Sequence, residues 1–533
     1  MSDSYDAIVI GSGPNGLVAA NVLADAGWSV LVCEAAASPG GAVRSAPIGD
    51  PAWIHDVASS FYPLAMVSPA LRSLGLEAHG LRWAHAPHVV AHPTVEGRAA
   101  VLSRERATTV ASVESFAKGD GAAMDALLSE WRHLQPSLAQ ALVGPFPPVA
   151  ATLGLVRRAK GDLLDVVRTT LLPLRRLVAE RFDGLGAPLL LAGSASHSAL
   201  GPEQVLSGFL GWLLVGLGDE HGFPVPVGGA GRLTDALVAR LESKGGELRC
   251  SSRVDRVVVE RGRAVGVAVD GSPVHARKAV LADVATPHLY LSLVGAGLLP
   301  PKLLARLERY EQDPSTFKVD WSLRAPIPWT ADAARAAGTI HMGRDLDHYT
   351  RSAASVAMGR IPAEPNLVMG QMTTTDPTRS PAGTETAWAY WRLPQRVTGD
   401  DVAGGPAIGG TWDERDEAAA VERIEGFIEE HAPGFRGLVT ERRVSSPRAL
   451  EAGDANLVGG AIGGGSSELH QQLVFRPVPG LVPAATPIKG LYLASASAHP
   501  GGGVHGACGA AAARLALRRG RFGVSRGTSP ASR

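Results

Sequence analysis

The first 34 residues contain the feature that most constrains the fold of this chain. Two apolar runs flank a glycine-rich turn and a helix-forming run, and an acidic residue follows the second. Tyr5 to Ile10 and Ser29 to Cys33 have the composition of short strands, and Leu17 to Ala26 has that of a helix. The turn reads Gly11-Ser12-Gly13-Pro14-Asn15-Gly16, and Glu34 ends the second strand. This order predicts a βαβ unit.

Each glycine of the turn has a mechanical reason to be there. Gly11 permits the tight turn from strand to helix, Gly13 lets the backbone approach a pyrophosphate, and Gly16 lets helix and strand pack closely. The helix start offers free amides and a partial positive charge to phosphates. Glu34 stands where a carboxylate can accept hydrogen bonds from a ribose diol. The pattern predicts a dinucleotide site, and a glycine-rich turn in an ordinary βαβ unit is the alternative.

Length and charge exclude several classes of protein. The chain has 533 residues, enough for two or three domains. Its 51 basic and 51 acidic side chains balance, which argues against nucleic acid as the main partner, because phosphate binding needs a basic face. No apolar run reaches the length of about 18 residues that a membrane-spanning helix needs. No basic and then apolar leader is visible at the start, so no secretory signal is expected.

The three cysteines, Cys33, Cys250 and Cys508, form neither a C-x-x-C pair nor a zinc spacing. We therefore expect no metal site, and a reduced, cytoplasmic protein is the simplest interpretation. Cys33 is expected to be a small buried apolar residue rather than a reactive thiol.

From about residue 70 to residue 222 the pattern is mostly helical. Asp120 to Leu142 is one predicted helix, and Leu155 to Phe182 is another, bent at Pro173. The second carries seven basic and three acidic side chains, a net charge of +4 (7 − 3). A solvated face on a core helix is one interpretation, and a helix lying on an anionic membrane surface is the other.

Two later blocks also contain glycine-rich turns. One begins at Pro226 and includes the hairpin signal Asp270-Gly271. The other starts at Gly459 and ends with a strand, the string His499-Pro500-Gly501-Gly502-Gly503-Val504-His505-Gly506 and a helix of small residues. The predicted elements of both blocks and of the region between them are helices 233–243, 413–431 and 507–517 and strands 247–250, 254–260, 264–269, 274–282, 317–321, 388–393 and 490–495.

The glycine pair Gly40-Gly41 follows Glu34 after six residues, with Arg44 beyond it. This extension indicates a cofactor larger than a nicotinamide dinucleotide, because a second backbone approach along the pyrophosphate is then needed. The C-terminal strand, glycines and helix supply another helix start that can face phosphate or ribityl groups. Two such units at opposite ends of the chain imply a cofactor long enough to touch both, and we predict FAD.

With these residues in view, the chain resembles the phytoene desaturase family of flavoproteins. That family includes bacterial carotenoid desaturases, carotenoid cis–trans isomerases and the pyridine nucleotide-disulfide oxidoreductase domain-containing protein 2 group. The resemblance covers nearly the whole length and is strongest at the opening turn with Gly40-Gly41, over Pro226 to Asp283, and from Leu491 to Gly506. The full H-P-G-G-G-V-x-G string looks most like the last-named group. Because the chain has no redox-active cysteine pair, disulfide chemistry is not expected.

The resemblance also implies roles for particular residues. It implies FAD contacts from Gly11, Gly13, Gly16, Glu34, Gly41 and Arg44, an adenine-side backbone contact from Val254, and isoalloxazine or ribityl contacts around Gly503 and Val504. The full predicted cofactor-binding set is Gly11, Ser12, Gly13, Pro14, Asn15, Gly16, Glu34, Ala35, Gly40, Gly41, Arg44, Val254, Ser495, Gly503 and Val504. Ser495 and Ser497 stand where family members often carry glycine, and residues 463–472 depart from the pattern that the group often shows. These departures leave the FAD prediction intact and the substrate open.

A flavin accepts hydride directly from a C–H bond, while the protein positions the substrate, excludes water and polarises the bond. His499, His505 and Lys318 are the predicted acid–base candidates, with Asp320 and His55 as further ones. Each has a plain structural alternative. His499 can cap a turn, and His505 can contact cofactor or solvent. Lys318 and Asp320 share one strand face, which either lines a cavity or meets water.

Flavin amine oxidases share the opening fingerprint, but they hold the amine between aromatic rings near the flavin. No Trp or Tyr occurs from Ala494 to Gly509, and small residues there suit a bulky apolar substrate better than a cation. We predict FAD-dependent dehydrogenation of a C–C bond in a lipophilic, carotenoid-like or other apolar substrate, with oxygen or a quinone as candidate electron acceptors. The alternatives are cis–trans isomerisation without net redox change, amine oxidation, and a non-catalytic flavin-bound partner protein.

The predicted fold class is α/β, an α+β two-domain flavoprotein. A discontinuous, Rossmann-like FAD-binding domain is expected from residues 1–70, 225–290 and 455–519. A substrate domain with a mixed sheet and a helical cap is expected from residues 71–224 and 291–454, and residues 520–533 are expected to form a polar tail. Helix starts from both chain ends should then converge on one cofactor. We expect a cytoplasmic location, with peripheral membrane contact as the second interpretation.

Overall fold

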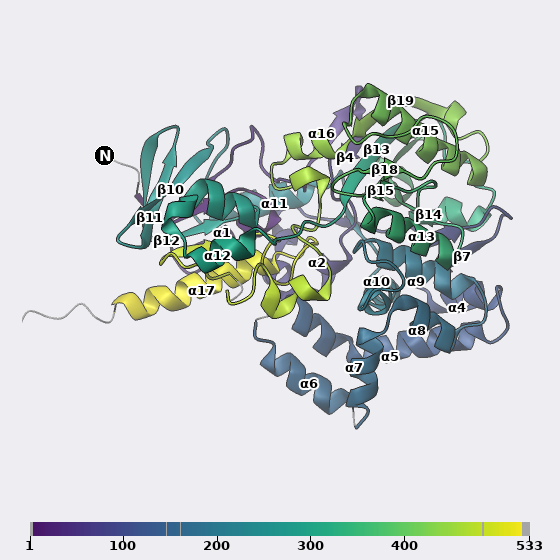
Figure 1. The fold of residues 1–533 in the computed structure, drawn as a ribbon, viewed down its shortest axis with the longest axis horizontal. Coiled ribbons are helices and arrows are strands. Elements are labelled where there is room, and N and C mark those ends of the chain that lie inside the picture. The colour runs from purple at the N-terminus through teal and green to yellow at the C-terminus, as the bar shows by residue number, and fades with distance from the viewer. Residues whose placement is uncertain (1–3, 145, 160, 482–483, 525–533) are drawn as a thin grey trace, which may run out of the picture.

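The computed structural model describes residues 4–144, 146–159, 161–481 and 484–524, and for residues 521–524 the backbone alone. Two large sheets lie toward opposite ends of the long axis, and helices pack against both (Figure 1). A layer formed by helices α4 to α10 lies below the second sheet in that view. The predicted α/β class with a Rossmann-like unit is confirmed.

The first sheet has a parallel centre and an antiparallel edge. Its strands follow the order β10-β11-β12-β1-β2-β9, and β20 pairs with the end of β12. β1 lies parallel to both β2 and β12, as the opening βαβ unit requires. Asp270 and Gly271, both with positive φ, form the predicted two-residue turn between β11 and β12. The bounds are β1 Ser4–Ile10, β2 Val30–Cys33, β9 Glu247–Arg249, β10 Val254–Glu260, β11 Arg263–Val269, β12 Ser272–Ala282 and β20 Leu491–Leu493.

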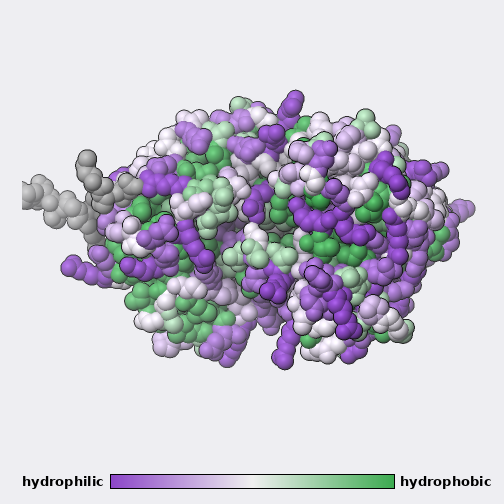
Figure 2. All heavy atoms as spheres, turned by 90° about the horizontal axis from the view of Figure 1, so that it is seen from above, coloured by the Kyte–Doolittle hydropathy of each residue, from purple (hydrophilic) through white to green (hydrophobic). Residues whose placement is uncertain are grey.

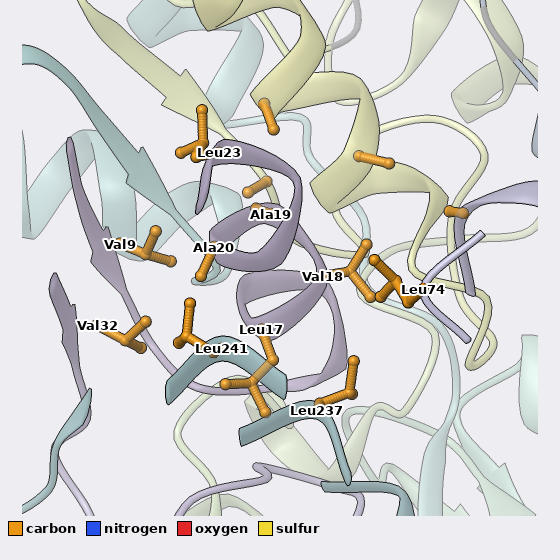
Figure 3. Close-up of a cluster of buried hydrophobic side chains, with 14 of the residues drawn as sticks. Val9, Leu17, Val18, Ala19, Ala20, Leu23, Val32, Leu74, Leu237 and Leu241 are labelled. Carbon is orange, nitrogen blue, oxygen red and sulfur yellow. The ribbon is translucent and has the colours of Figure 1, made fainter. Parts of the chain in front are cut away.

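Helix α1 lies at the centre of a buried apolar cluster on one face of this sheet. Its Leu17 and Leu23 belong to the same cluster as Val9 and Val32 of the sheet and Leu237 of α11 (Figure 3). Burial of apolar surface is the main force that holds a βαβ unit together. Three of the helices that contribute to the cluster are α1 Pro14–Asp25, α11 Gly231–Ser243 and α17 Ala507–Val524.

Helix α17 approaches α1 closely because glycines face it. A Cβ at Gly509 would lie 1.8 Å from the carbonyl oxygen of Asn15, and a Cβ at Gly506 would lie 2.6 Å from Cγ2 of Val18. The starts of the two helices therefore meet, and the opening turn and the closing H-P-G-G-G string lie together, as predicted. α17 continues to Val524, into the stretch expected to form a tail, and residues 525–533 lie outside the described part.

The second sheet is mixed. Its strands follow the order β19-β13-β17-β16-β14-β6-β7; β14 and β6 pair in parallel, and the other neighbours are antiparallel. β13 and β17 pair directly, with Val319 opposite Ala389, which confirms that residues 317–321 and 388–393 belong to one sheet. The bounds are β6 His88–Pro93, β7 Ala99–Leu102, β13 Ser315–Leu323, β14 Ala337–Met342, β16 Leu367–Gln371, β17 Glu385–Leu393 and β19 Val439–Ser445.

The two faces of β13 differ in chemistry because side chains alternate along a strand. Trp321 lies in a buried apolar cluster with Ile424 of helix α15 (Glu414–His431). Lys318 and Asp320 lie on the other face and are only 3% and 0% exposed. The sheet therefore has one apolar face and one face that carries buried charge.

The region from 70 to 222 is less helical than predicted. Strands β6 and β7 form a hairpin there, closed by Gly97 at φ +81, and β6 joins the second sheet through β14. A short apolar run such as His88 to Pro93 is ambiguous between helix and strand, and here pairing with a distant strand decides it.

The predicted helix from Leu155 to Phe182 is wrong as a single element, because it is three helices. Gly161, at φ +111, separates the first two, a conformation that only glycine adopts without strain. Pro173 separates the second from the third, at the predicted break. The bounds of the helical layer are α4 Arg106–Glu114, α5 Asp120–Val143, α6 Val149–Ala159, α7 Leu163–Leu171, α8 Leu174–Arg181, α9 Gly186–Ser196 and α10 Ser207–His221.

The remaining elements connect the sheets or cover their edges. Within the described residues, no helix is both long enough and apolar enough to cross a membrane. The bounds of these connecting and covering elements are β3 Ser45–Ile48, β4 Asp50–Asp56, β5 Trp83–Ala84, β8 Val225–Pro226, β15 Arg360–Ile361, β18 Gly399–Asp400, α2 Pro63–Val67, α3 Pro69–Arg72, α12 Pro301–Leu307, α13 Leu346–Ala357, α14 Met372–Thr375 and α16 Pro447–Gly453.

The contact between α1 and α17 leads to a test of stability. Gly509→Ala is expected to lower the free energy of unfolding by about 1–3 kcal/mol, because the new methyl group meets a backbone atom. The matched control is Gly426→Ala in α15, where a Cβ lies 3.1 Å from Nη2 of Arg436 and alanine favours the helix. Urea unfolding followed by circular dichroism compares the two variants, and equal midpoints would contradict the tight packing of α1 on α17.

Candidate active site

The opening turn brings backbone very close to backbone. Gly11 has φ +89, and a Cβ there would lie 2.8 Å from the carbonyl oxygen of Asp283. A Cβ at Gly16 would lie 2.2 Å from the carbonyl oxygen of Gly11. A Cβ at Gly13 would lie 2.7 Å from Oδ2 of Asp283. Side chains at these positions would fill the space between the start of α1 and the end of β12.

Asp283 is a residue of this site that sequence reasoning missed. It follows β12 directly, is 5% exposed, and accepts a hydrogen bond at Oδ2 from the N–H of Gly16 at 2.7 Å. Burial raises the pKa of its carboxyl to about 7, and the nearby negative charges of Asp454 and Glu34 add to the shift. An acid at the carboxyl end of a strand that runs parallel to β1 was the available signal, because such ends meet at one edge of the sheet.

Glu34 is held at the end of β2 by three donors. Its Oε2 accepts from the backbone N–H of Ser12 at 2.8 Å and from the Ser12 hydroxyl at 2.6 Å, and its Oε1 accepts from the N–H of Ala36 at 2.8 Å. A carboxylate has about four acceptor positions, so capacity remains for a ribose hydroxyl. Ala35 lies between Glu34 and Ala36. The N–H of Ser252 donates to the backbone carbonyl of Glu34, which brings the chain before Val254 to this edge.

The second glycine pair lies directly beside the first turn. The N–H of Gly40 donates to the carbonyl of Ser12 at 3.1 Å, and a Cβ at Gly41 would lie 3.3 Å from Cα of Gly13. Arg44 donates from Nε to the carbonyl of Gly41 at 2.7 Å. A cavity of about 50 Å³ adjoins these residues, lined by Gly41, Arg44, Val57, Leu450 and Asp454 among others.

The closing loop lies on the other side of the first helix start. A Cβ at Gly503 would lie 2.7 Å from Cδ1 of Leu64, and Val504 packs against the apolar cluster around α1. Ser495 is buried two residues beyond β20, and its hydroxyl accepts from the N–H of Ser497 at 3.3 Å. The closing string thus leads into the contact between α17 and α1, where Gly506 and Gly509 lie against Val18 and Asn15.

Two buried charges fix the neighbouring glycine loop, residues 459–465. Arg476 is 1% exposed and donates to the carbonyls of Gly463 at 2.8 Å and Ala496 at 2.7 Å. Asp313 accepts the N–H of Gly463 at 3.0 Å. A Cβ at Gly502 would lie 2.8 Å from Cα of Gly463, so the fixed loop packs directly on the closing string. Sequence reasoning missed both charged residues, because neither belongs to a local motif.

The two predicted histidines have different surroundings. His505 accepts the N–H of Ala507 at its Nδ1, at 3.0 Å, and its carbonyl accepts the Ser68 hydroxyl at 2.5 Å, so it begins helix α17. His499 is 4% exposed, its ring lies 5.0 Å from that of Phe146, and its Nδ1 is buried without a hydrogen-bond partner among the described residues. Burial lowers the pKa of each ring to about 4, so both are neutral near pH 7.

Lys318 and the other candidates form a separate cluster under the second sheet. Lys318 donates to the carboxylate of Asp320 and to the backbone carbonyl of Asp56, the latter at 2.9 Å. Burial lowers the pKa of Lys318. His55 lies 3.2 Å from the hydroxyl of Ser322, and burial lowers its pKa to about 3. The shared face of Lys318 and Asp320 therefore meets protein groups rather than water.

An aromatic group on β17 was also missed. Trp388 and Tyr390 stack at 5.9 Å with an interplanar angle of 3°, and Phe61 lies 6.0 Å from Trp388. Nζ of Lys318 lies 5.9 Å from the centre of the Trp388 ring, and the guanidinium of Arg392 lies 5.4 Å from that of Tyr390. The alternating W-x-Y-x-R in a predicted strand was the signal for a shared face.

These features fit the diphosphate of a dinucleotide. The glycines leave room that any Cβ would fill, and the start of α1 carries a partial positive charge. Oδ1 of Asn15, in the first turn of α1, is buried without a partner among the described residues. Glu34 keeps acceptor capacity at the strand end. In a ligand with phosphate and sugar hydroxyl groups, the phosphates would accept from the amides at the start of α1, and the hydroxyl groups could donate to the oxygens of Asn15 and Glu34.

Comparisons with known proteins agree with this geometry. A family model described as an NAD(P)-binding Rossmann-like domain matches residues 9–74. The chain is 28% identical to pyridine nucleotide-disulfide oxidoreductase domain-containing protein 2 of Mus musculus, over 97% of this chain and 94% of that protein. It is 24% identical to the neurosporene-forming phytoene desaturase of Cereibacter sphaeroides, over 100% of this chain and 98% of that protein.

Solved structures share the fold over nearly the whole chain. An oxidoreductase from Methanosarcina mazei matches with a TM-score of 0.63 at 14% identity, over 96% of this chain and 99% of that one. A putrescine oxidase bound to putrescine matches with a TM-score of 0.59 at 17% identity, over 98% and 99%. The two near-full-length sequence relatives agree with the resemblance indicated by the motifs: over nearly its whole length the chain is similar to phytoene desaturases and to the pyridine nucleotide-disulfide oxidoreductase domain-containing protein 2 group.

Proposed function

We propose that the chain binds FAD and uses it to dehydrogenate a C–C bond in a lipophilic substrate. The observation that carries the proposal is the meeting of the two helix starts, with Gly509 against Asn15. The second glycine pair lies beside the same turn, with Gly41 against Gly13. A nicotinamide dinucleotide needs one such phosphate-binding unit, whereas a longer flavin dinucleotide can use both.

Different residues would bind different parts of FAD. The start of α1 with Gly11 and Gly13 would hold the diphosphate, and Glu34 would hold the ribose of the adenosine half. The closing loop around Gly503 and Val504 would receive the flavin half. Each group is bound by backbone amides or by a carboxylate already fixed in place, so little ordering cost remains for binding.

Bound FAD supplies the acceptor for a hydride from a substrate C–H bond. The chain then has to accept the proton that leaves the neighbouring carbon. We assign this role to His499, because its Nδ1 is buried without a hydrogen-bond partner among the described residues. His505 serves instead as the cap that positions α17 and the closing string. The fixed loop at Gly463 keeps that string in place.

The buried charges favour a neutral substrate. The Trp388 and Tyr390 rings could in principle hold an ammonium group, as the putrescine oxidase likeness invites. However, Lys318 already lies at the Trp388 ring and Arg392 at the Tyr390 ring. An ammonium group of a substrate would have to compete with an internal cation at each of these two rings.

A direct test compares substrates by anaerobic bleaching of the flavin. We expect the purified protein to be yellow with bound FAD, and phytoene in detergent micelles to bleach it, with a desaturated product. Putrescine should leave the spectrum unchanged. Bleaching by putrescine alone would support amine oxidation instead. Isomerised phytoene formed only with pre-reduced flavin would support the isomerase alternative, and protein that takes up no FAD would refute the proposal.

The role of Glu34 is tested by cofactor retention. Glu34→Ala is expected to weaken FAD binding by about 10-fold to 100-fold, the range that the loss of a hydrogen bond to a charged group gives. Glu242→Ala, an exposed acid on α11, is the control and should bind FAD as the unchanged protein does. Fluorescence titration of the apoprotein with FAD measures both constants. Equal constants for the two variants would remove Glu34 from the ribose site.

The raised pKa of Asp283 predicts a pH dependence. Below about pH 7 its carboxyl is neutral, and above that pH its negative charge faces the diphosphate at the same helix start. The FAD dissociation constant should therefore rise between about pH 6 and pH 8. If bound FAD raises the pKa of Asp283 by about one unit, the rise is up to about 10-fold. Because the folded pKa of this acid is raised, the stability of the apoprotein should also fall as the pH rises toward about 7.

Asp283→Asn keeps the shape of the side chain and an acceptor for the N–H of Gly16, but it removes the charge. The variant should bind FAD with the same constant across this pH range. Asp235→Asn on the surface of α11 is the control and should keep the pH dependence. A slope that survives Asp283→Asn would show that another group titrates.

A further inference from the structure

Two histidine rings from different elements meet where the helical layer touches the second sheet. His197 follows helix α9, and His341 lies on β14. Their Nε2 atoms lie 2.9 Å apart, which is the distance of a hydrogen bond. His341 is 0% exposed, and His197 is half-buried.

The strand register places His341 on the face of the sheet that carries the aromatic and charged side chains. His341 lies opposite Val368 of β16, and Val368 lies opposite Tyr390 of β17. Tyr390 in turn lies opposite Lys318. Side chains that lie directly opposite each other point to the same face, so the histidine pair belongs to this row.

The contact between the two rings fixes where their protons lie. Burial lowers the pKa of His197 to about 4 and that of His341 well below its ordinary value, so both rings are neutral near pH 7 and each carries one N–H. Nδ1 of His341 is buried without a partner among the described residues, and a Cβ at Gly193 of α9 would lie 2.4 Å from it. A buried N–H without a partner is rarer than a buried acceptor without one. His341 therefore keeps its proton on Nε2 and donates to His197.

This arrangement leaves the hydroxyl hydrogen of Tyr390 free. His197 accepts at Nε2, so its own proton lies on Nδ1, which is 3.4 Å from the Tyr390 hydroxyl oxygen. The histidine is thus the donor in this long contact. The Tyr390 hydrogen then has no acceptor in the part of the chain that the structure describes. Burial raises the pKa of Tyr390, so this hydrogen stays in place near neutral pH.

Space remains beside the hydroxyl, and a row of rings leads away from it. Tyr390 lies on an inner strand of the sheet and yet is only half-buried, as is Phe61, so packing leaves a gap there. The rings stand 6.0, 5.9 and 6.3 Å apart in the order Phe61, Trp388, Tyr390 and His197. Leu64, three residues beyond Phe61, is the side chain that a Cβ at Gly503 would meet. The row thus runs from the glycines that we assign to the flavin to a hydrogen-bond donor.

We propose that the lipophilic substrate carries a neutral oxygen group, a hydroxyl or a carbonyl, and that the Tyr390 hydroxyl donates a hydrogen bond to it. The apolar chain of the substrate lies along the row of rings, between this oxygen and the flavin. His341 is a positioning residue, because through His197 it prevents Tyr390 from donating to the histidine. The inference rests on the proposed function and defines its substrate class more closely.

A neutral oxygen group fits this place better than a carboxylate does. The cations beside the Tyr390 ring already have partners, Lys318 in Asp320 and Arg392 in Asp313. A carboxylate would be buried beside charges that are already paired, which is costly.

Other positions for the oxygen, and other occupants, fit less well. The face of the molecule seen in Figure 2 mixes hydrophilic with hydrophobic side chains, so an oxygen group that reached that surface would find polar partners without a buried donor. A water molecule at Tyr390 needs two to four polar partners, whereas the cluster around Trp388 contains apolar side chains such as Val368 and Met372. The donor therefore suits an oxygen that an apolar chain carries into the protein.

The test measures how much one oxygen atom improves the substrate. Phytoene is compared with phytoene that carries a hydroxyl or a keto group on a terminal isoprene unit, by the rate constant for anaerobic bleaching of the flavin-loaded protein in micelles. The ratio of each oxygenated form to phytoene is divided by the same ratio for Tyr390→Phe, which cancels differences in partition into micelles. This quotient should be about 3 to 10, the range that one neutral hydrogen bond gives. The keto form should show it too, because a ketone can only accept.

Matched variants separate recognition from folding. Tyr349→Phe removes a hydroxyl that also lies against a histidine of this sheet, 3.1 Å from Nε2 of His92, and it should keep the advantage of the oxygenated forms. His341→Leu should lose most of that advantage, since His197 can then accept from Tyr390. His341→Gln keeps an N–H that can donate to His197 and should restore it. Thermal midpoints and FAD contents are measured for all variants.

Three results would overturn the proposal. A quotient of about 1 would leave only water at the Tyr390 hydroxyl. An advantage for the hydroxyl form alone would show that the protein accepts rather than donates, and an equal loss in Tyr349→Phe would show a general effect on the sheet. Bleaching by phytoene with a quotient of about 1 rejects this inference alone. If none of the three molecules bleaches the flavin, the proposed function fails, and the quotient is then formed from their dissociation constants, measured by quenching of tryptophan fluorescence.

Discussion

Close approach of backbone to backbone at the start of α1 is the constraint on which the rest of the structure depends. Three segments far apart in sequence touch this one turn: Gly41 at Gly13, Asp283 at Gly11, and Gly509 at Asn15. A Cβ at Gly11 or Gly509 would lie 2.8 Å or 1.8 Å from a backbone oxygen, and Gly41 has φ +54, so all three positions favour glycine. The order of strands in the first sheet follows from the same requirement, because β1 must lie between β2 and β12 to bring these segments together.

Electrostatics sets a second condition at the same place. The start of α1 carries a partial positive charge, and the structure places acids against it, with Asp283 directly on the N–H of Gly16 and Glu34 on that of Ser12. Burial keeps the pKa of Asp283 near 7, so this acid can be neutral when an anionic ligand arrives. The helix start is thus satisfied in the free protein without a permanent negative charge in the path of the diphosphate.

Local sequence patterns predicted the parts of the fold that local chemistry decides. The glycine turn, the Gly40-Gly41 pair and the Asp270-Gly271 hairpin each depend on a backbone conformation that few residues adopt. Features that depend on pairing between distant segments were missed. Strands β6 and β7 form because β14 is available, and Asp283 and Arg476 act through residues more than a hundred positions away or through a neighbouring loop. Gly161 indicated a break between two helices, but the apolar spacing on both sides of it favoured one continuous helix.

The two faces of the second sheet carry different side chains, apolar on one face and charged or aromatic on the other. Its apolar face packs on α15 and is closed, while its other face collects Lys318, Asp320 and Arg392 with the Trp388 and Tyr390 rings. Buried charges are stable there because each has a partner: Lys318 pairs with Asp320, and Arg392 pairs with Asp313. The proposal of an apolar substrate is supported by these charges, which already have partners inside the protein.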